Sequence, residues 1–72
     1  MTETATGQAG ANVRAEMARR RISQQTLADL IGLSQAGLSK RLNGHVPWDV
    51  NELAKAADAL GVHLHALVGD RP

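Results

Sequence analysis

Serine and glycine residues divide this sequence into short segments in which apolar residues recur every three or four positions. That spacing places apolar side chains on one face of a helix, and no segment shows the two-residue alternation of a β-strand. The chain has 72 residues and no cysteine. It therefore lacks both the length for several domains and the disulfides that support small secreted folds. We expect one small all-α domain.

Five helices are predicted from the apolar spacing and from the residues that begin and end each segment. Serine and aspartate side chains can accept free backbone N–H groups at helix starts, and glycine ends helices because it adopts the left-handed conformation without steric cost. The first helix runs from Gly10 to about Arg21, the second from the cap Ser23 to Gly32, the third from the cap Ser34 to about Asn43, the fourth from the cap Asp49 to Gly61, and the last from Leu64 to Val68.

The fourth helix has the most distinct start. Asp49 is followed three residues later by Glu52, the spacing of a capping box in which each residue bonds the other's backbone N–H. Trp48 and Leu53 flank the cap at the positions of a hydrophobic staple. The predicted buried face of this helix consists of Val50, Leu53, Ala57 and Leu60.

The ends of the chain differ in composition from its centre. Residues 1–9 are small and polar, and we interpret them as a flexible arm, with residues 10–69 as the folded domain and residues 70–72 as a tail. No apolar run approaches the roughly 20 residues of a membrane helix, and no signal-peptide pattern opens the sequence. We expect a cytoplasmic protein without membrane association.

The charges are unevenly distributed along the chain. Residues 12–45 carry six basic and two acidic residues, whereas residues 46–72 carry two basic and four acidic ones. Such an asymmetry fits a domain that presents a basic face to a polyanion. The run Arg19, Arg20 and Arg21 has two interpretations: it attracts DNA, or its cations complement the negative end of the helix dipole.

Catalytic and metal-binding chemistry is not indicated. There is no cysteine nucleophile, no coherent Ser–His–Asp set and no glycine-rich phosphate loop, so we do not expect an enzyme. His63 and His65 are two positions apart and point to different sides of a helix, which does not suit a metal site. No cofactor and no small-molecule ligand are predicted.

Residues 23–43 carry the functional signal. They form two predicted helices joined by a short turn containing Gly32, an arrangement whose second helix can enter the DNA major groove. If Leu38 and Leu42 face inward, the opposite face of the second helix presents only small, amide, hydroxyl and cationic groups. These are Gln35, Ala36, Ser39, Lys40 and Asn43.

This face has the chemistry that base edges recognise. Glutamine can bond adenine at two positions, lysine reaches guanine acceptors, and an alanine methyl can contact the thymine methyl group. The helix has no carboxylate, which the DNA phosphates would repel. These residues predict a helix that reads bases.

The run SQQTLADLIGLSQAGLSKRLNG, followed by ELAKAADALGV, resembles the lambda-repressor-like helix-turn-helix family of Cro and phage-repressor type, over residues 11–68. The resemblance implies a compact five-helix bundle that binds operator DNA, usually as a homodimer. It implies base contacts from Gln35, Ala36, Ser39 and Lys40, and phosphate contacts from Gln24, Ser34, Arg41 and Asn43. In that family the glutamine matching Gln24 also braces the one matching Gln35.

Two positions depart from the family pattern. Arg41 stands where many members keep an apolar residue, and Leu42 stands where many have glutamate. The Arg41 side chain either reaches a phosphate or extends into solvent. Gly37 lies inside the third helix at a cost of about 1 kcal/mol relative to alanine, which close packing or close approach to DNA would explain.

Two functions are consistent with these residues. The favoured hypothesis is a sequence-specific transcriptional regulator of the repressor type, whose helix 34–43 reads operator half-sites about 34 Å apart in a dimer. The alternative is a protein-interaction module, such as an antitoxin or anti-repressor, that uses the same fold to bind protein.

Overall fold

The computed structural model of the chain describes residues 4–68, which form five helices and no strand. The prediction of an all-α, five-helix domain is thereby confirmed. The helices are α1 (Thr4–Arg20), α2 (Gln24–Ile31), α3 (Gln35–Leu42), α4 (Val50–Leu60) and α5 (Leu64–Val68).

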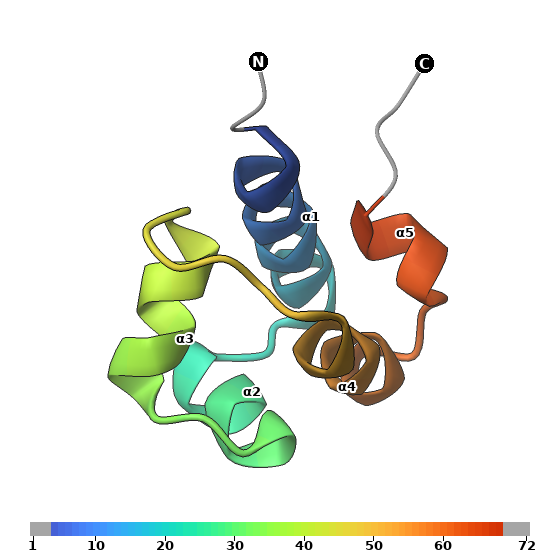
Figure 1. Cartoon of the computed structure of the whole chain (residues 1–72). Coiled ribbons are helices and arrows are strands. Elements are labelled where there is room, and N and C mark those ends of the chain that lie inside the picture. The colour runs from blue at the N-terminus through green and yellow to red at the C-terminus, as the bar shows by residue number, and fades with distance from the viewer. Residues whose placement is uncertain (1–3, 69–72) are drawn as a thin grey trace.

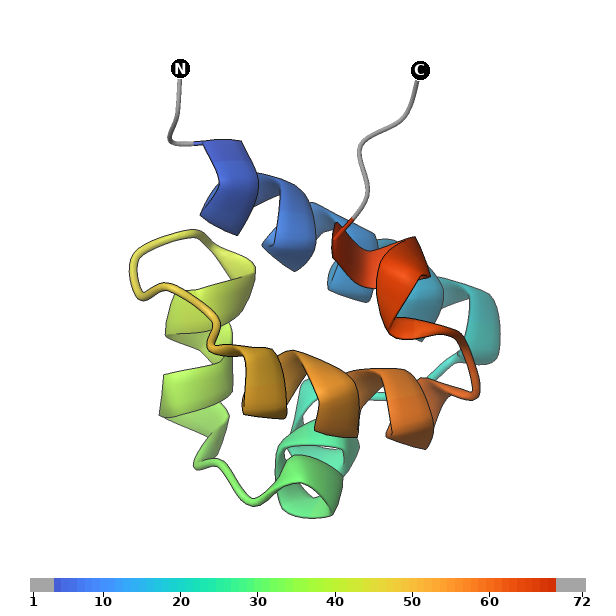
Figure 2. The same ribbon diagram turned by 45° about the vertical axis from the view of Figure 1, so that its right-hand side comes forward.

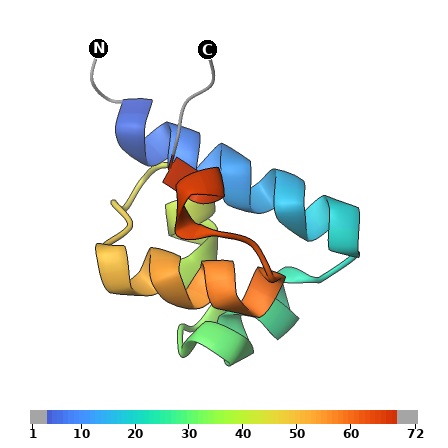
Figure 3. The ribbon, with the colours of Figure 1, turned by 90° about the vertical axis from the view of Figure 1, so that its right-hand side faces the viewer.

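Three of the other four helices pack against α1. α3 lies on one side of α1 and α5 on the other (Figures 1 and 2), and α4 also contacts α1. α2 packs against α3 and α4 without approaching α1 closely. Figure 3, viewed from the side of α5, shows this helix between α1 and α4, both of which it contacts. This arrangement leaves one long side of α3 without a neighbouring helix.

One apolar core joins all five helices. Its four largest fully buried side chains come from four different helices: Val13, Leu27, Leu38 and Leu67. Because no helix has an apolar face large enough to fold alone, each depends on its neighbours. The rest of the buried core consists of Ala9, Met17, Ala28, Ile31, Leu42, Trp48, Leu53, Ala56, Ala57 and Leu60.

The predicted helix ends at the centre of the chain are confirmed. Ser23, Ser34 and Asp49 each accept a backbone N–H of the first helical turn, and Asp49 and Glu52 form the complete capping box. Gly32 and Gly61 end α2 and α4 with φ angles of 78° and 74°. Those angles lie in the left-handed region that favours glycine.

The start of α1 differs from the prediction. The helix begins at Thr4, so the assignment of residues 1–9 to an arm is wrong from residue 4 onward; residues 1–3 and 70–72 lie outside the described part of the chain. Ala9 is buried at 4% exposure. Residues 4–9 include no large apolar side chain, so the periodicity of apolar residues gave no sign of a helix there.

The buried face of α4 also differs at one position. Val50 is 70% exposed rather than buried, whereas Ala56 is fully buried in the core. Val50 is the first residue of α4. Val50, Leu53 and Ala57 have the i, i+3, i+7 spacing of one apolar helix face. That spacing does not show that the first turn of the helix extends beyond the core.

Candidate nucleic-acid interface

α3 presents the polar face that the sequence predicts. Leu38 and Leu42 are buried at 0% and 5% exposure. The side chains on the other side of the helix are accessible: Gln35, Ala36, Lys40 and Asn43 are exposed, and Ser39 is half-buried. The four predicted base-contacting residues therefore share one accessible helix face.

α3 is held at its start by the turn from α2. The Leu33 amide donates to the Ala28 carbonyl at 2.9 Å, which closes the turn after Gly32. The Ser34 hydroxyl oxygen accepts the Gly37 amide at 2.9 Å. Because Ser34 uses its oxygen as an acceptor in this cap, its O–H remains able to donate to a phosphate.

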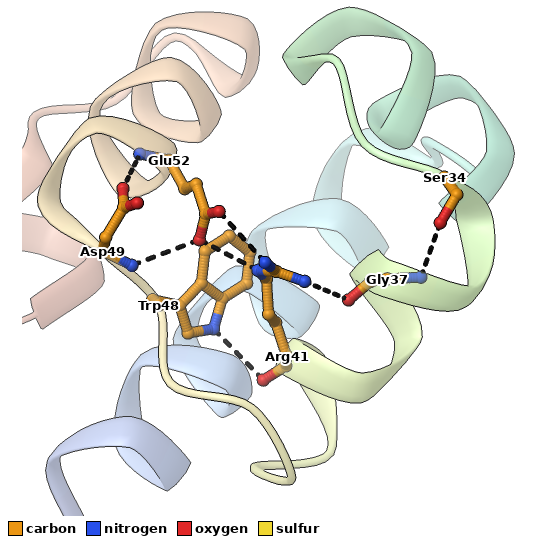
Figure 4. A network of polar contacts seen from close by, with 6 residues as sticks. All are labelled: Ser34, Gly37, Arg41, Trp48, Asp49 and Glu52. Atoms are coloured by element: carbon orange, nitrogen blue, oxygen red, sulfur yellow. Dashed lines mark hydrogen bonds and ion pairs between the residues drawn. The ribbon is translucent and has the colours of Figure 1, made fainter.

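At its other end α3 is linked to α4, and to Trp48 just before the α4 cap, by hydrogen bonds from side chains. No Cα atom of α3 lies within 8 Å of one in α4. Arg41 Nε and Nη2 donate to the two carboxylate oxygens of Glu52 at 2.9 and 3.1 Å, and Trp48 Nε1 donates to the Arg41 carbonyl at 3.1 Å (Figure 4). We call these three residues, Arg41, Trp48 and Glu52, the α3–α4 clamp.

The clamp is continuous with the cap of α4. Glu52 Oε1, which accepts Arg41 Nε, also accepts the Asp49 amide at 3.1 Å (Figure 4). The Arg41 and Glu52 side chains are only 18% and 19% exposed. A bidentate guanidinium–carboxylate pair of this kind has a fixed geometry as well as charge attraction, so it restricts how α3 can tilt relative to α4.

Arg41 therefore does not occupy either of the positions expected from the sequence. Instead of reaching outward to a phosphate or to solvent, its guanidinium donates three hydrogen bonds within the domain, the third from Nη1 to the Gly37 carbonyl at 2.8 Å. The sequence could not show this, because Glu52 lies 11 positions away on another helix, where its spacing from Asp49 indicated only a capping box.

The same contacts explain Gly37. A Cβ atom at this position would lie 3.1 Å from the Ser34 hydroxyl oxygen and 3.4 Å from Arg41 Nη1. Both neighbours are held by hydrogen bonds, so they have little freedom to move away. Close packing within the protein accounts for this glycine.

The predicted phosphate contacts Gln24 and Asn43 lie at helix ends. Gln24 is the first residue of α2 and is half-buried; within residues 4–68 no hydrogen bond links it to Gln35, so the bracing expected from the resemblance is not seen. Asn43 ends α3 and accepts a hydrogen bond from Arg14 Nη2 of α1 at 2.8 Å. No local pattern in the sequence identifies Arg14, because its partner lies 29 positions away on another helix.

The basic run at the end of α1 is largely engaged within the helix. Arg19 and Arg20 lie three and four positions after Glu16, about one helical turn, and each pairs with a different oxygen of its carboxylate. Arg21 ends the helix with a positive φ of 55°. The two paired arginines thus have a role in α1 that requires no DNA.

The described residues contain neither a metal-binding cluster nor a membrane-spanning helix. Between residues 4 and 68, no three histidine, aspartate or glutamate side chains are grouped so that they could hold a metal ion. In the same part of the chain, no helix combines the length and the apolar character needed to span a bilayer.

Comparison with known proteins identifies the class to which this fold and this face belong. The model of a helix-turn-helix family matches residues 13–67. Because the match covers most of the chain, the protein belongs to this lambda-repressor-like helix-turn-helix family of DNA-binding transcription regulators. No curated protein gives a match.

Solved structures share the whole fold at low sequence identity. The restriction-modification controller protein C.AhdI from Aeromonas hydrophila is 25% identical over 89% of this chain and 97% of its own, with a TM-score of 0.83. The P22 c2 repressor, solved with a synthetic operator, is 24% identical over 86% and 96%, with a TM-score of 0.75.

The same fold also occurs as a part of a larger protein. Hydroxypropylphosphonic acid epoxidase from S. wedmorenis is 22% identical over 94% of this chain but only 36% of its own, with a TM-score of 0.84. Fold similarity at this level therefore does not by itself assign a function, which has to be argued from the exposed face of α3.

Proposed function

We propose that the protein is a sequence-specific transcriptional repressor that acts in the cytoplasm by placing α3 and its caps, residues 34–43, in the major groove of operator DNA. The single observation that carries the proposal is the accessible face of α3, on which Gln35, Ala36 and Lys40 are exposed while its leucines are buried. Family membership supports it, as does the likeness in fold to a repressor solved with a synthetic operator.

In this proposal the side chains divide into two groups. Gln35, Ala36, Ser39 and Lys40 contact base edges, which supply the sequence preference. Gln24, Ser34 and Asn43 contact phosphates, which fix the register of the protein on the duplex without reading sequence. Arg41, which the sequence predicted to contact a phosphate, is instead proposed to act through the clamp as a positioning residue.

The protein is further proposed to bind as a homodimer, whose two copies of α3 read half-sites about one helical turn apart, roughly 34 Å. Selection of bound sites from a random DNA pool tests both parts of this proposal. A palindromic consensus with that spacing is the expected result, and a single unpaired half-site would contradict the dimer.

The base-reading role is tested by Gln35→Ala on the selected operator. We expect a loss of about 1–3 kcal/mol on the operator, with relaxed preference at one base pair and little change on random DNA. Fluorescence anisotropy with both DNAs measures it, and Gln25→Ala on the neighbouring helix is the matched control that leaves base preference unchanged.

Two outcomes would contradict the proposal. An equal loss on operator and random DNA for Gln35→Ala would remove Gln35 from the base-reading group. If the wild-type protein binds no DNA at low salt but captures a stoichiometric protein partner, the protein-interaction alternative replaces the repressor.

A further inference from the structure

The cations of the described residues fall into two groups. Three arginines form ion pairs within the domain: Arg19 and Arg20 share the carboxylate of Glu16, and Arg41 pairs with Glu52. Four other basic side chains between residues 4 and 68 have no carboxylate partner there: Arg14, Arg21, Lys40 and Lys55. Of these, Lys40 lies on the exposed face of α3, and Arg14 is hydrogen-bonded to the residue that ends α3.

Arg14 is joined to the exposed face of α3 through Asn43. A guanidinium can only donate hydrogen bonds, so the 2.8 Å contact from Arg14 Nη2 requires the amide oxygen of Asn43 to face it. The amide nitrogen of Asn43 then points to the Ser39 hydroxyl, at 3.5 Å. A row of polar groups, Arg14, Asn43 and Ser39, therefore leads from α1 to the base-reading face.

An open groove runs beside Arg14. Its walls are Arg14 and three alanines of α1, with Leu42 and Asn43 from the end of α3. Ala11, Ala15 and Ala18 are exposed and carry only a methyl group each, so a bulky ligand can approach the guanidinium without meeting a longer side chain. The only charged group lining the groove is a cation that lacks an ion-pair partner in the described residues.

We propose that this groove binds a phosphate of the DNA backbone, with Arg14 as the cation that contacts it and Asn43 as the residue that orients Arg14. The inference rests on the proposed function and extends it to a side of the domain outside the helix-turn-helix segment. A guanidinium matches the charge and the geometry of a phosphate. Since the groove ends at Asn43, DNA whose major groove holds α3 brings its flanking backbone to this end of the helix.

The test is the salt dependence of binding by Arg14→Gln, measured by anisotropy on the selected operator and on random DNA. In the proposed homodimer the variant loses one phosphate contact in each half-site, which lowers the slope of log K against log salt by about 0.9 per half-site and about 1.8 per dimer. Each lost contact weakens binding to both DNAs by roughly tenfold at about 0.1 M salt. The matched control is Lys55→Gln, which removes another exposed, unpaired cation from α4, outside the groove, and leaves the slope near that of the wild type.

Two further measurements separate the possible outcomes. Arg14→Lys keeps the charge and recovers most of the slope, which a merely structural role of the arginine would not produce. In the second measurement, single operator phosphates are replaced by neutral methylphosphonate. We expect replacement of the phosphate that Arg14 contacts to weaken DNA binding by the wild type, but to cause no further loss of affinity in Arg14→Gln.

If the wild type binds the operator and Arg14→Gln keeps the wild-type salt slope, the inference about Arg14 is overturned. The proposed function would still stand after that result. If the wild type shows no DNA binding at low salt, both fail together. Circular dichroism of the Arg14 variants confirms that each comparison is made on folded protein.

Discussion

At the scale of single residues, Gly10 lies where the backbones of α1 and α3 come close together. Gly10 is buried on α1, and a Cβ atom there would lie 2.5 Å from the Leu42 carbonyl oxygen and 2.8 Å from that of Arg41. These are backbone atoms in the last turn of α3, so they cannot rotate away as a side chain does. Gly10 therefore sets how closely α1 and α3 can cross.

We predict that Gly10→Ala destabilises the protein by about 1–3 kcal/mol, the usual cost of overpacking. Helix propensity alone predicts the opposite sign, because alanine is favoured over glycine inside a helix by about 1 kcal/mol. Urea unfolding followed by circular dichroism measures the difference. Ala11→Gly, at the adjacent exposed position, is the control, because it measures the alanine-to-glycine difference in helix propensity without a change in packing.

A Gly10→Ala variant as stable as the wild type, or more stable, would show that α1 and α3 can separate at little cost. The sequence does not reveal this role. Gly10 lies next to a segment of small residues, and its contacts are with residues more than 30 positions away.

At the scale of helices, local signals predicted ends well and buried faces less well. A cap acts within three residues, so Ser23, Ser34 and Asp49 could be identified without knowing the fold. The start of α1 and the exposure of Val50 depend instead on which helices lie alongside. Periodicity identifies a helix face, whereas tertiary packing decides how far along the helix that face is covered.

The cap of α4 gives a prediction at this scale. Asp49→Ala removes the side chain that accepts the Glu52 amide at 2.8 Å, and we expect a loss of about 1 kcal/mol in the free energy of unfolding. Asp49→Asn is the control, since it removes the same charge but keeps a side-chain oxygen that can accept the Glu52 amide. Equal midpoints for the two variants in urea would mean that the cap contributes only through its charge.

At the scale of the whole molecule, the exposed polar face of α3 was predictable from the sequence, whereas the contacts that hold α3 in place were not. Two leucines four positions apart fix which side of α3 faces outward, so the polar face of Gln35 and Lys40 follows from the sequence. The partners of Arg14 and Arg41 do not follow, because each contact requires helices that are distant in sequence to be brought together. Arg41 was assigned to DNA from its place in the motif, while the fold uses it between α3 and α4.

The clamp connects α4 to the orientation of the reading helix, and Glu52→Gln tests this connection. Glutamine keeps the length of the side chain, and its amide oxygen can still accept the Asp49 amide, so the capping box persists. The change removes the negative charge and the oxygen that accepts Arg41 Nη2, while the oxygen that accepts the Asp49 amide can still accept Arg41 Nε. α3 then keeps its packing on α1 and α2 but loses its charged link to α4.

For Glu52→Gln, electrostatics and the positioning of α3 predict opposite changes in affinity for the operator. Removing a negative charge should strengthen attraction to DNA of any sequence, whereas a less constrained α3 should bind the operator more weakly and lower the ratio of operator to random affinity. We expect the second effect to dominate on the operator, with anisotropy on both DNAs in one salt series as the measurement. Glu16→Gln is the control, because it frees Arg19 and Arg20 without touching α3 and should strengthen both affinities alike. If Glu52→Gln behaves like that control, the clamp stabilises the fold but does not orient the reading helix.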